Sequence, residues 1–187
     1  MATALVIVCK DEEVAKQLQQ VFTLLWLRSY TSTDVVGIEI GGTVKNIAAI
    51  AGGIVEGLGL GDNAKAGLVT RGLAEMVRLG VAMGAQRETF MGLSGVGDLM
   101  VTCFSDHSRN TRFGRMLGKG RTVKQIEEEM NMVAEGVPNT ESVYHFAQSR
   151  DIRTPITDLL YDLLNEKISV TEAALRLLSR SPRAEAE

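Results

Sequence analysis

The sequence predicts a mainly α-helical fold, in which an all-helical domain follows a short β-α-β unit. The composition changes at Gly37, because all 19 glycines lie at or after this position and apolar residues then recur at the three- and four-residue spacing of helices. Before Gly37, an unbroken apolar run rich in β-branched residues is typical of a buried strand. We therefore expect a first domain over residues 1–33 and a helical domain over residues 34–187.

The β-α-β unit begins with a strand over Ala4–Cys9, which its apolar run predicts to be buried on both faces of a parallel sheet. Asp11 is a suitable N-cap for a helix over Glu12–Phe22, and a second strand is expected within Leu25–Thr31. A two-stranded sheet leaves both of its outer edges unpaired. We therefore expect the chain to form a homo-oligomer, or to pair with another segment, through Ala4–Cys9.

A glycine-rich helix is predicted over Glu39–Leu58. One of its faces is apolar, with residues at helical spacing: Val44, Ile47, Ala48, Ala51, Ile54, Val55 and Leu58. A second stripe carries little side-chain bulk: Gly42, Asn46, Ala49 and Gly53. Because an interior glycine destabilises a helix by about 1 kcal/mol relative to alanine, we expect another backbone to approach this second stripe closely.

Lys45 lies off the apolar face of this helix, about one turn from the predicted start. The positive end of the helix dipole and partial burial both disfavour a charged amine there. The position would therefore suit Lys45 to accept a proton. The alternative is a surface lysine at the edge of a core helix.

Further helices are predicted from capping residues and from apolar periodicity. The first begins at Gly61 or Asp62 and ends at Gly84, a short helix covers 88–93, and another follows a turn within 94–104. The next helices run from Ser108 to Leu117, from the capping box Thr122–Gln125 onward, and from Pro138 to Gln148. The last two begin at Thr154–Pro155 and at a second capping box, Ser169–Glu172. The first of these has an apolar stripe that predicts its buried face: Leu68, Val69, Leu73, Met76, Val77 and Val81.

Composition and charge exclude several classes of function. The formal net charge is −3 and no basic block is present, so nucleic acid is not an expected partner. Cys9 and Cys103 are too far apart for a metal knuckle, and His107 and His145 do not complete a metal site with them. No apolar run approaches the ~18 residues of a membrane span, and the apolar N-terminal strand lacks a basic leader. We expect a cytoplasmic protein without a bound metal.

The polar segment Ser108-Arg109-Asn110 stands at a predicted helix start, where backbone N–H groups attract anions. Arginine adds a forked donor for phosphate oxygens, so the segment is a candidate phosphate site. Ordinary N-capping by Ser108, with a solvent-facing Arg109, is the alternative. Asp98 could hold a substrate hydroxyl or pair with the lysine of the central helix, or it could be an acid of a helix N-terminus. For Glu135 the sequence suggests no structural partner.

Several motifs follow one another along the chain. They are Gly37–Asn46, Gly57–Ala66, Thr70–Met76, Gly95–Leu99, Thr102–Cys103, Ser108–Asn110 and Val133–Gly136. Together they closely resemble the bacterial NAD(P)-dependent glycerol-3-phosphate dehydrogenases, over essentially the whole chain. The resemblance implies that residues from about Asp34 onward form that family's all-helical substrate domain, which is similar to the C-terminal domain of 6-phosphogluconate dehydrogenase. It also implies that residues 1–33 are the closing β-α-β of a dinucleotide-binding Rossmann domain.

The resemblance further implies an activity and a set of site residues. The family interconverts sn-glycerol 3-phosphate and dihydroxyacetone phosphate with NAD or NADP as cofactor, and so feeds glycerophospholipid synthesis. The lysine matching Lys45 is the family's proton acceptor. The matching positions that bind glycerol 3-phosphate are Lys45, Asp98, Ser108, Arg109 and Asn110. The matching positions that contact the dinucleotide are Arg109, Val133 and Glu135.

Three features depart from the family pattern. The sequence contains no counterpart of the N-terminal Gly-x-Gly-x-x-Gly/Ala loop or of the N-domain lysine that helps to bind substrate. Thr43-Val44 stands where Ala-Leu is usual, and Thr23–Arg28 differs from the family's usual sequence. The first departure leaves open a non-catalytic helical module that acts by assembly or by binding a phosphorylated metabolite. Another β-hydroxyacid-type dehydrogenase is a second alternative, against which the Gly-Gly-x-x-Lys-Asn and Ser-Arg-Asn sequences argue.

Overall fold

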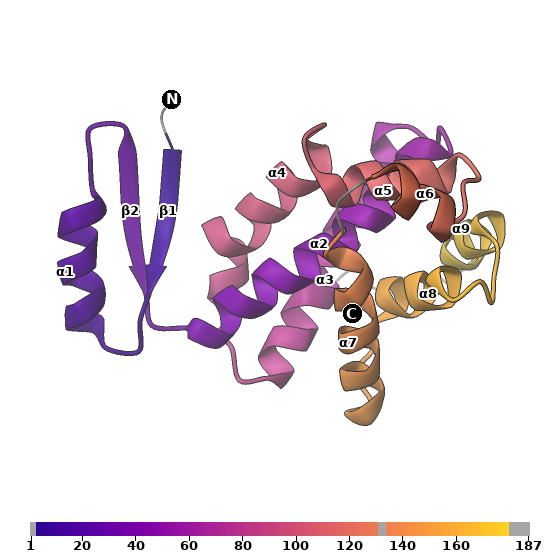
Figure 1. Cartoon of the computed structure of the whole chain (residues 1–187). Helices are drawn as coiled ribbons and strands as arrows, with labels where there is room; N and C mark the ends of the chain where they lie inside the picture. Colours follow the sequence, from indigo (N-terminus) through magenta and orange to yellow (C-terminus); the bar gives the residue numbers. More distant parts are fainter. Residues whose placement is uncertain (1–2, 131–133, 180–187) are drawn as a thin grey trace.

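The computed structural model of the chain describes residues 3–130 and 134–179. It confirms the predicted fold class, because a two-stranded parallel sheet with one helix precedes a bundle of helices (Figure 1). The elements in chain order are β1 (Thr3–Val8), α1 (Glu12–Phe22), β2 (Leu27–Ser32), α2 (Val35–Gly57), α3 (Asp62–Ala82), the 3₁₀-helix η1 (Arg87–Met91), the π-helix η2 (Leu93–Gly97), α4 (Asp98–Phe104), α5 (Arg109–Gly118), α6 (Val123–Glu129), α7 (Gly136–Ser149), α8 (Pro155–Leu164) and α9 (Val170–Leu178).

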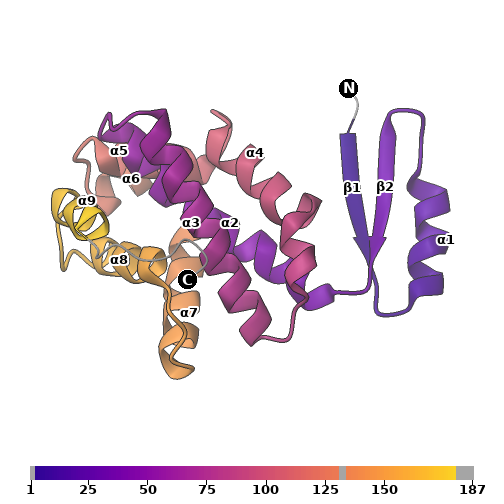
Figure 2. The same ribbon diagram turned by 180° about the vertical axis from the view of Figure 1, so that it is seen from behind.

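β1, α1 and β2 form the N-terminal unit, which stands at one end of the molecule beside the helical body formed from α2 onward (Figures 1 and 2). The two strands pair in parallel, with Thr3 opposite Leu27, and Asp11 caps α1 as predicted. The prediction that Ala4–Cys9 is buried on both faces is wrong, since β1 is exposed at its start and half-buried beyond. The reason is that the described sheet has just two strands, so much of each strand stays open to solvent.

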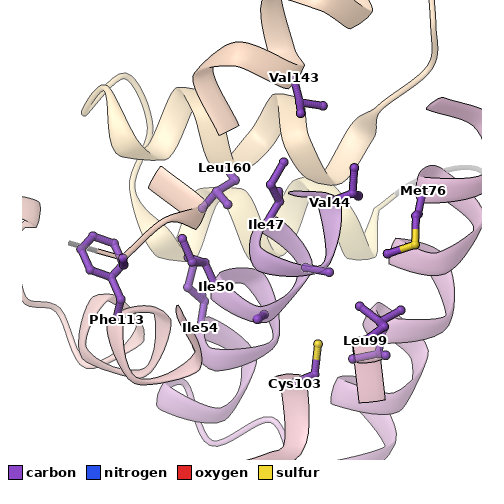
Figure 3. Close-up of a cluster of buried hydrophobic side chains, with 14 of the residues drawn as sticks. Val44, Ile47, Ile50, Ile54, Met76, Leu99, Cys103, Phe113, Val143 and Leu160 are labelled. Carbon is purple, nitrogen blue, oxygen red and sulfur yellow. The ribbon is translucent and has the colours of Figure 1, made fainter. Parts of the chain in front are cut away.

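α2 is the central helix of the helical body, and it packs against α3, α4, α5, α7 and α8. It begins at Val35 with Asp34 as its N-cap, which is four residues before the predicted start at Glu39. Its apolar face forms the middle of the hydrophobic core (Figure 3). Figure 3 labels core residues from six helices: Val44, Ile47, Ile50, Ile54, Met76, Leu99, Cys103, Phe113, Val143 and Leu160.

α2 is long and apolar enough to cross a membrane when judged by length and composition. In this structure 67% of its apolar window is buried against the rest of the chain. The core helix of a folded domain passes the same test, so the finding is weak evidence for a membrane span. The expected absence of a membrane span therefore stays a prediction.

α2 and α5 approach each other closely where glycines face backbone atoms. A Cβ at Gly53 would lie 2.1 Å from the Thr111 carbonyl oxygen, and a Cβ at Gly114 would lie 1.9 Å from the Ile50 carbonyl oxygen. Both distances are far below van der Waals contact, so the two helices can meet because these residues have no side chain. The predicted close approach is confirmed at Gly53. It is wrong at Gly42, where a Cβ would meet no described heavy atom within 4 Å.

The predicted caps of the later helices are confirmed. The Ser108 hydroxyl accepts the Thr111 N–H at the start of α5. Thr122 and Gln125 form the reciprocal capping box of α6. Ser169 caps α9 by accepting the Glu172 N–H, but the Glu172 carboxylate accepts a hydrogen bond from Arg176, so the structure shows one half of the predicted second capping box. Local side-chain chemistry thus sets the starts of these helices, as expected for Ser and Thr at the N-cap.

The buried face of α3 differs from the predicted apolar stripe. Val81 is exposed, whereas Leu79 and Glu75 are buried. The Glu75 carboxylate accepts N–H bonds from Ile156 and Thr157, each at 3.0 Å, at the start of α8. Burial raises the pKa of the Glu75 carboxyl, although these hydrogen bonds act in the opposite direction. A carboxylate of α3 therefore caps α8 from another part of the chain.

Candidate active site

Lys45 of α2 and Asp98 of α4 form an ion pair in which the lysine amine donates a hydrogen bond to the carboxylate. The Lys45 side chain is 23% exposed, so the pair is partly shielded from water. Asp98 is the first residue of α4, and the Thr102 hydroxyl donates to its carbonyl oxygen at 2.7 Å. Asp98 therefore fulfils two of the predicted possibilities, as the partner of Lys45 and as the acid of a helix N-terminus.

The predicted place of Lys45 within its helix is wrong. Because α2 begins at Val35, Lys45 lies about three turns from the N-terminus. The helix dipole acts mainly on groups within the first turn. The charge next to the Lys45 amine is instead the carboxylate of Asp98.

A chain of hydrogen-bonded amides begins at the residue after Lys45. The Asn110 side-chain nitrogen donates to the Asn46 side-chain oxygen at 2.9 Å, and the Gly136 N–H donates to the Asn110 side-chain oxygen at 2.9 Å. Both asparagine side chains are buried. These bonds hold α2, α5 and the start of α7 together beside Lys45. No role in the site was predicted for Asn46 or Gly136, although both lie within the motifs that carry the family resemblance.

Arg109 and Glu135 lie at the exposed rim of the same site. An Arg109 guanidinium nitrogen is 3.7 Å from one Glu135 carboxylate oxygen, and the Asn46 amide donates to the other at 3.4 Å. Glu135 therefore has structural partners, contrary to the prediction from sequence. The Ser108 hydroxyl caps α5, which is the alternative predicted for it, whereas Arg109 and Asn110 both reach groups outside α5.

The fold thus collects most of the predicted site residues around one stretch of α2. Lys45 contacts Asp98, and Asn110 contacts Asn46, so the two predicted halves of the site meet at adjacent residues of α2. Ser108 adjoins this group through the first turn of α5. Val133 lies outside the described residues. Within the described ranges, no group of three or more His, Cys, Asp or Glu residues is placed to hold a metal ion.

A second charged cluster, which the sequence did not predict, ties α2 to the loop before α5. The Glu56 carboxylate is 3.0 Å from the Lys65 amine and 2.7 Å from Arg115 Nε, and Arg115 also lies 2.9 Å from Asp106. Burial acts to raise the pKa of the Glu56 carboxyl, but the hydrogen bonds from Lys65 and Arg115 outweigh it, so that pKa is lowered. The cluster thereby fixes the loop that leads into Ser108.

The helical body thus brings an amine, a carboxylate, two amides and a guanidinium together around one stretch of α2. The family described as the NAD-dependent glycerol-3-phosphate dehydrogenase C-terminus matches residues 34–175. Because this match covers more than half of the sequence, the chain belongs to that family.

Individual relatives agree with the family match. The glycerol-3-phosphate dehydrogenase (NAD(P)+) of Citrifermentans bemidjiense is 50% identical over 185 residues, which cover 99% of this chain and 55% of the relative. The enzyme of the same name from Staphylococcus epidermidis is 52% identical over 176 residues, which cover 94% of this chain and 53% of the relative. The crystal structure of glycerol-3-phosphate dehydrogenase from Coxiella burnetii has 40% identity and a TM-score of 0.92, covering 96% of this chain and 55% of that one. The chain therefore spans about half the length of the curated relatives it matches.

Proposed function

We propose that the chain is the substrate-binding part of a glycerol-3-phosphate dehydrogenase, which interconverts sn-glycerol 3-phosphate and dihydroxyacetone phosphate. The observation that carries the proposal is the Lys45–Asp98 ion pair, one residue along α2 from the Asn46–Asn110 hydrogen bond. An amine that can exchange a proton and donors that can bind a phosphate are the groups this reaction needs from a protein. The names of the relatives support the same reaction.

Lys45 acts as the general base in this proposal. Its neutral amine accepts the proton of the secondary hydroxyl as the carbon–oxygen bond becomes a carbonyl, and in the reverse direction its ammonium returns that proton to the carbonyl oxygen. Asp98 holds the amine in place through the observed ion pair and can also accept a hydrogen bond from a substrate hydroxyl.

Ser108, Arg109 and Asn110 hold the phosphate or glycerol oxygens of the substrate in this proposal. The Arg109 guanidinium offers a forked donor, and backbone N–H groups at the start of α5 favour an anion. Asn110 is fixed from two sides, by Asn46 and by the Gly136 N–H, so its position is set before a ligand arrives. A substrate whose phosphate is bound at this end would present its secondary hydroxyl to the Lys45 amine.

The exposed rim residues fit a dinucleotide. Arg109 and Glu135 keep 45% and 65% of their side-chain surface exposed, so a guanidinium for phosphate oxygens and a carboxylate for ribose hydroxyls are both accessible. We assign these two residues, together with Val133, to the binding of NAD or NADP. When bound, the nicotinamide cofactor takes up or delivers the hydride.

Replacing Lys45 by alanine tests the assignment of the base. Loss of a general acid–base group lowers turnover about 10²–10⁴-fold, so we expect Lys45→Ala to abolish measurable NADH formation from glycerol 3-phosphate. The matched control is Lys16→Ala, which removes an exposed lysine that pairs with Glu12 and Glu13 of α1. Near-normal turnover in a Lys45→Ala protein of unchanged helical content would refute the role of Lys45.

A non-catalytic, metabolite-binding helical module is the alternative function. It is supported by the hydrophobic core cluster, which lies wholly within the helical body. Calorimetric titration of the chain with glycerol 3-phosphate and with NADH separates the two functions. Binding of both ligands with turnover supports the enzyme. Binding of glycerol 3-phosphate without NADH supports the metabolite-binding module, and binding of neither supports a module that acts by assembly.

We further propose that residues 1–33 belong to a dinucleotide-binding domain and residues 34–187 to the substrate domain. The expected setting is a cytoplasmic protein that supplies glycerol phosphate for glycerophospholipid synthesis. The open strand edges of the N-terminal unit support pairing with another segment or with a second copy of the chain. Light scattering over a range of concentrations tests this pairing, and a monomer at every concentration would count against a second copy.

A further inference from the structure

Gly42 is a helical glycine without a packing reason among the described residues. Its neighbour Gly41 has one, because a Cβ there would lie 2.2 Å from the Ser94 carbonyl oxygen. A Cβ at Gly42 would meet no described heavy atom within 4 Å, and the residue does not have a left-handed φ. An interior glycine destabilises a helix relative to alanine. The space above Gly42 is therefore open to a group from outside the described residues.

Gly42 lies directly beneath the polar groups of the site. Lys45 and Asn46 follow it by three and four residues, so all three share one face of α2. Helical side chains lean toward the N-terminus and cover the turn before their own Cα. In agreement, the Asn46 side-chain nitrogen donates to the Gly42 carbonyl oxygen at 3.2 Å. A small molecule that contacts the Lys45 amine on this face would thus lie over the Gly42 Cα.

We propose that Gly42 is a specificity-determining residue, whose missing side chain leaves room for the carbon chain of glycerol 3-phosphate to lie against the backbone of α2. This inference rests on the proposed function. It assigns the phosphate to the Arg109–Asn110 end of the site and the reacting carbons to the space between Lys45 and Gly42. A methyl group at position 42 would fill the space that the reacting carbons need.

The test compares Gly42→Ala with a matched control, Gly67→Ala. Gly67 is also an interior glycine, in α3, and a Cβ there would likewise meet no described heavy atom within 4 Å. Both substitutions should therefore raise the thermal unfolding midpoint by about 1–4 °C, because alanine restricts the unfolded chain and clashes with nothing. A lower midpoint for Gly42→Ala would show that the space is needed by the chain itself, and would overturn the proposal.

Calorimetric titration of the same proteins then distinguishes a loss of space for the ligand from a change in stability. We expect Gly42→Ala to weaken glycerol 3-phosphate binding about tenfold or more, the effect of overfilling a packed site, while Gly67→Ala binds like wild type. Inorganic phosphate, which probes the Arg109–Asn110 end, should bind all three proteins equally. Equal glycerol 3-phosphate affinity in Gly42→Ala and wild type overturns the inference and leaves the proposed function standing. Failure of the wild-type chain to bind glycerol 3-phosphate rejects the proposed function, and the inference falls with it.

Discussion

The N-terminal unit and the helical body differ in how much apolar surface they bury. Among the described residues of the N-terminal unit, Ala15 is the buried apolar residue, whereas the hydrophobic core cluster lies wholly in the helical body. The large apolar side chains that the N-terminal unit exposes are Val14, Leu18, Val21, Phe22, Leu24, Leu25, Trp26 and Tyr30. Both regions contain the elements that local sequence predicts. Helix caps and strand pairing can therefore define secondary-structure elements without supplying a hydrophobic core that stabilises them.

The N-cap aspartates of the two regions also differ in how many segments they connect. Asp11 accepts hydrogen bonds from two N–H groups of its own helix, and these bonds are exposed. Asp34 caps α2 through the Gly37 N–H and also accepts from the Gln86 N–H at 2.9 Å and the Thr89 hydroxyl at 2.6 Å. Asp11 therefore stabilises one helix, whereas Asp34 fastens α2 to η1.

Gly114→Ala should have the largest effect, because it breaks the tightest contact of the helical body. Its Cβ would collide with the Ile50 carbonyl oxygen, and a backbone collision cannot be relieved by side-chain rotation. We expect a loss of about 3 kcal/mol or more in the free energy of unfolding, measured by urea denaturation. The separation of α2 and α5 should also break the Asn46–Asn110 hydrogen bond and weaken ligand binding. Unchanged stability would mean that the two helices are not in backbone contact.

Asp34→Ala should have an intermediate effect, and Asp11→Ala is its matched control in the N-terminal unit. Loss of a cap together with two further, partly buried hydrogen bonds predicts a cost of about 2 kcal/mol for Asp34→Ala in cooperative unfolding. Asp11→Ala should leave that transition nearly unchanged, since α1 contributes little to the core. Equal costs for the two variants would show that the N-terminal unit unfolds together with the helical body.

The effect of Asp34 should also depend on pH. Burial acts to raise the pKa of its carboxyl, but the hydrogen bonds from Thr89, Gly37 and Gln86 outweigh it, so that pKa lies below its ordinary value of 3.8. A carboxyl whose pKa is lowered on folding adds stability above the ordinary value, and this stability is lost as the pH falls through the folded-state pKa. The stability difference between wild type and Asp34→Ala, followed by urea titration from pH 7 to acid, should therefore shrink below that value. A difference that grows with acidity would contradict this assignment.

The smallest effect on stability is expected for the double variant Leu25→Ser, Trp26→Ser. Both side chains are exposed, at 97% and 60%, so the free energy of unfolding should change by no more than about 0.5 kcal/mol. Self-association of the chain, measured by sedimentation velocity, should nevertheless decrease, because the variant removes apolar surface from the N-terminal unit. Leu175→Ser, which changes an exposed leucine of α9, is the control and should leave association unaltered. Association that persists in the double variant would locate the contact elsewhere.

Much of the fold could be predicted because the signals that define each element are local. Four N-cap residues bond to a backbone N–H within three residues of their own position: Asp11, Ser108, Thr122 and Ser169. Such contacts can be predicted from adjacent residues in the sequence. The start of α2 was misplaced for the opposite reason. Its cap, Asp34, is fixed by contacts with η1, and residues Val35 to Ile38 show no periodicity that separates them from a loop.

The candidate site was predicted unevenly. Lys45, Asp98, Arg109 and Asn110 carry side chains whose chemistry suggests a role, and the motifs supplied the rest through resemblance. Asn46, Gly136 and the partners of Glu135 were not assigned, because their meaning lies in contacts between distant segments. An amide or a glycine N–H in a sequence gives no sign of the group that will face it.

Local sequence is sufficient to specify which segments form helices and strands, which helices have a Ser, Thr or Asp cap next to their first residue, and which residues carry an amine, a carboxylate or a guanidinium, since each of these depends on residues a few positions apart. The tertiary structure decided which glycines of α2 are packed and which one faces open space. It also decided that the charge next to the Lys45 amine is the Asp98 carboxylate and not the N-terminal end of α2. The physical reason is that steric room and electrostatic environment are set by atoms from other helices, whose approach depends on the packing of the whole core.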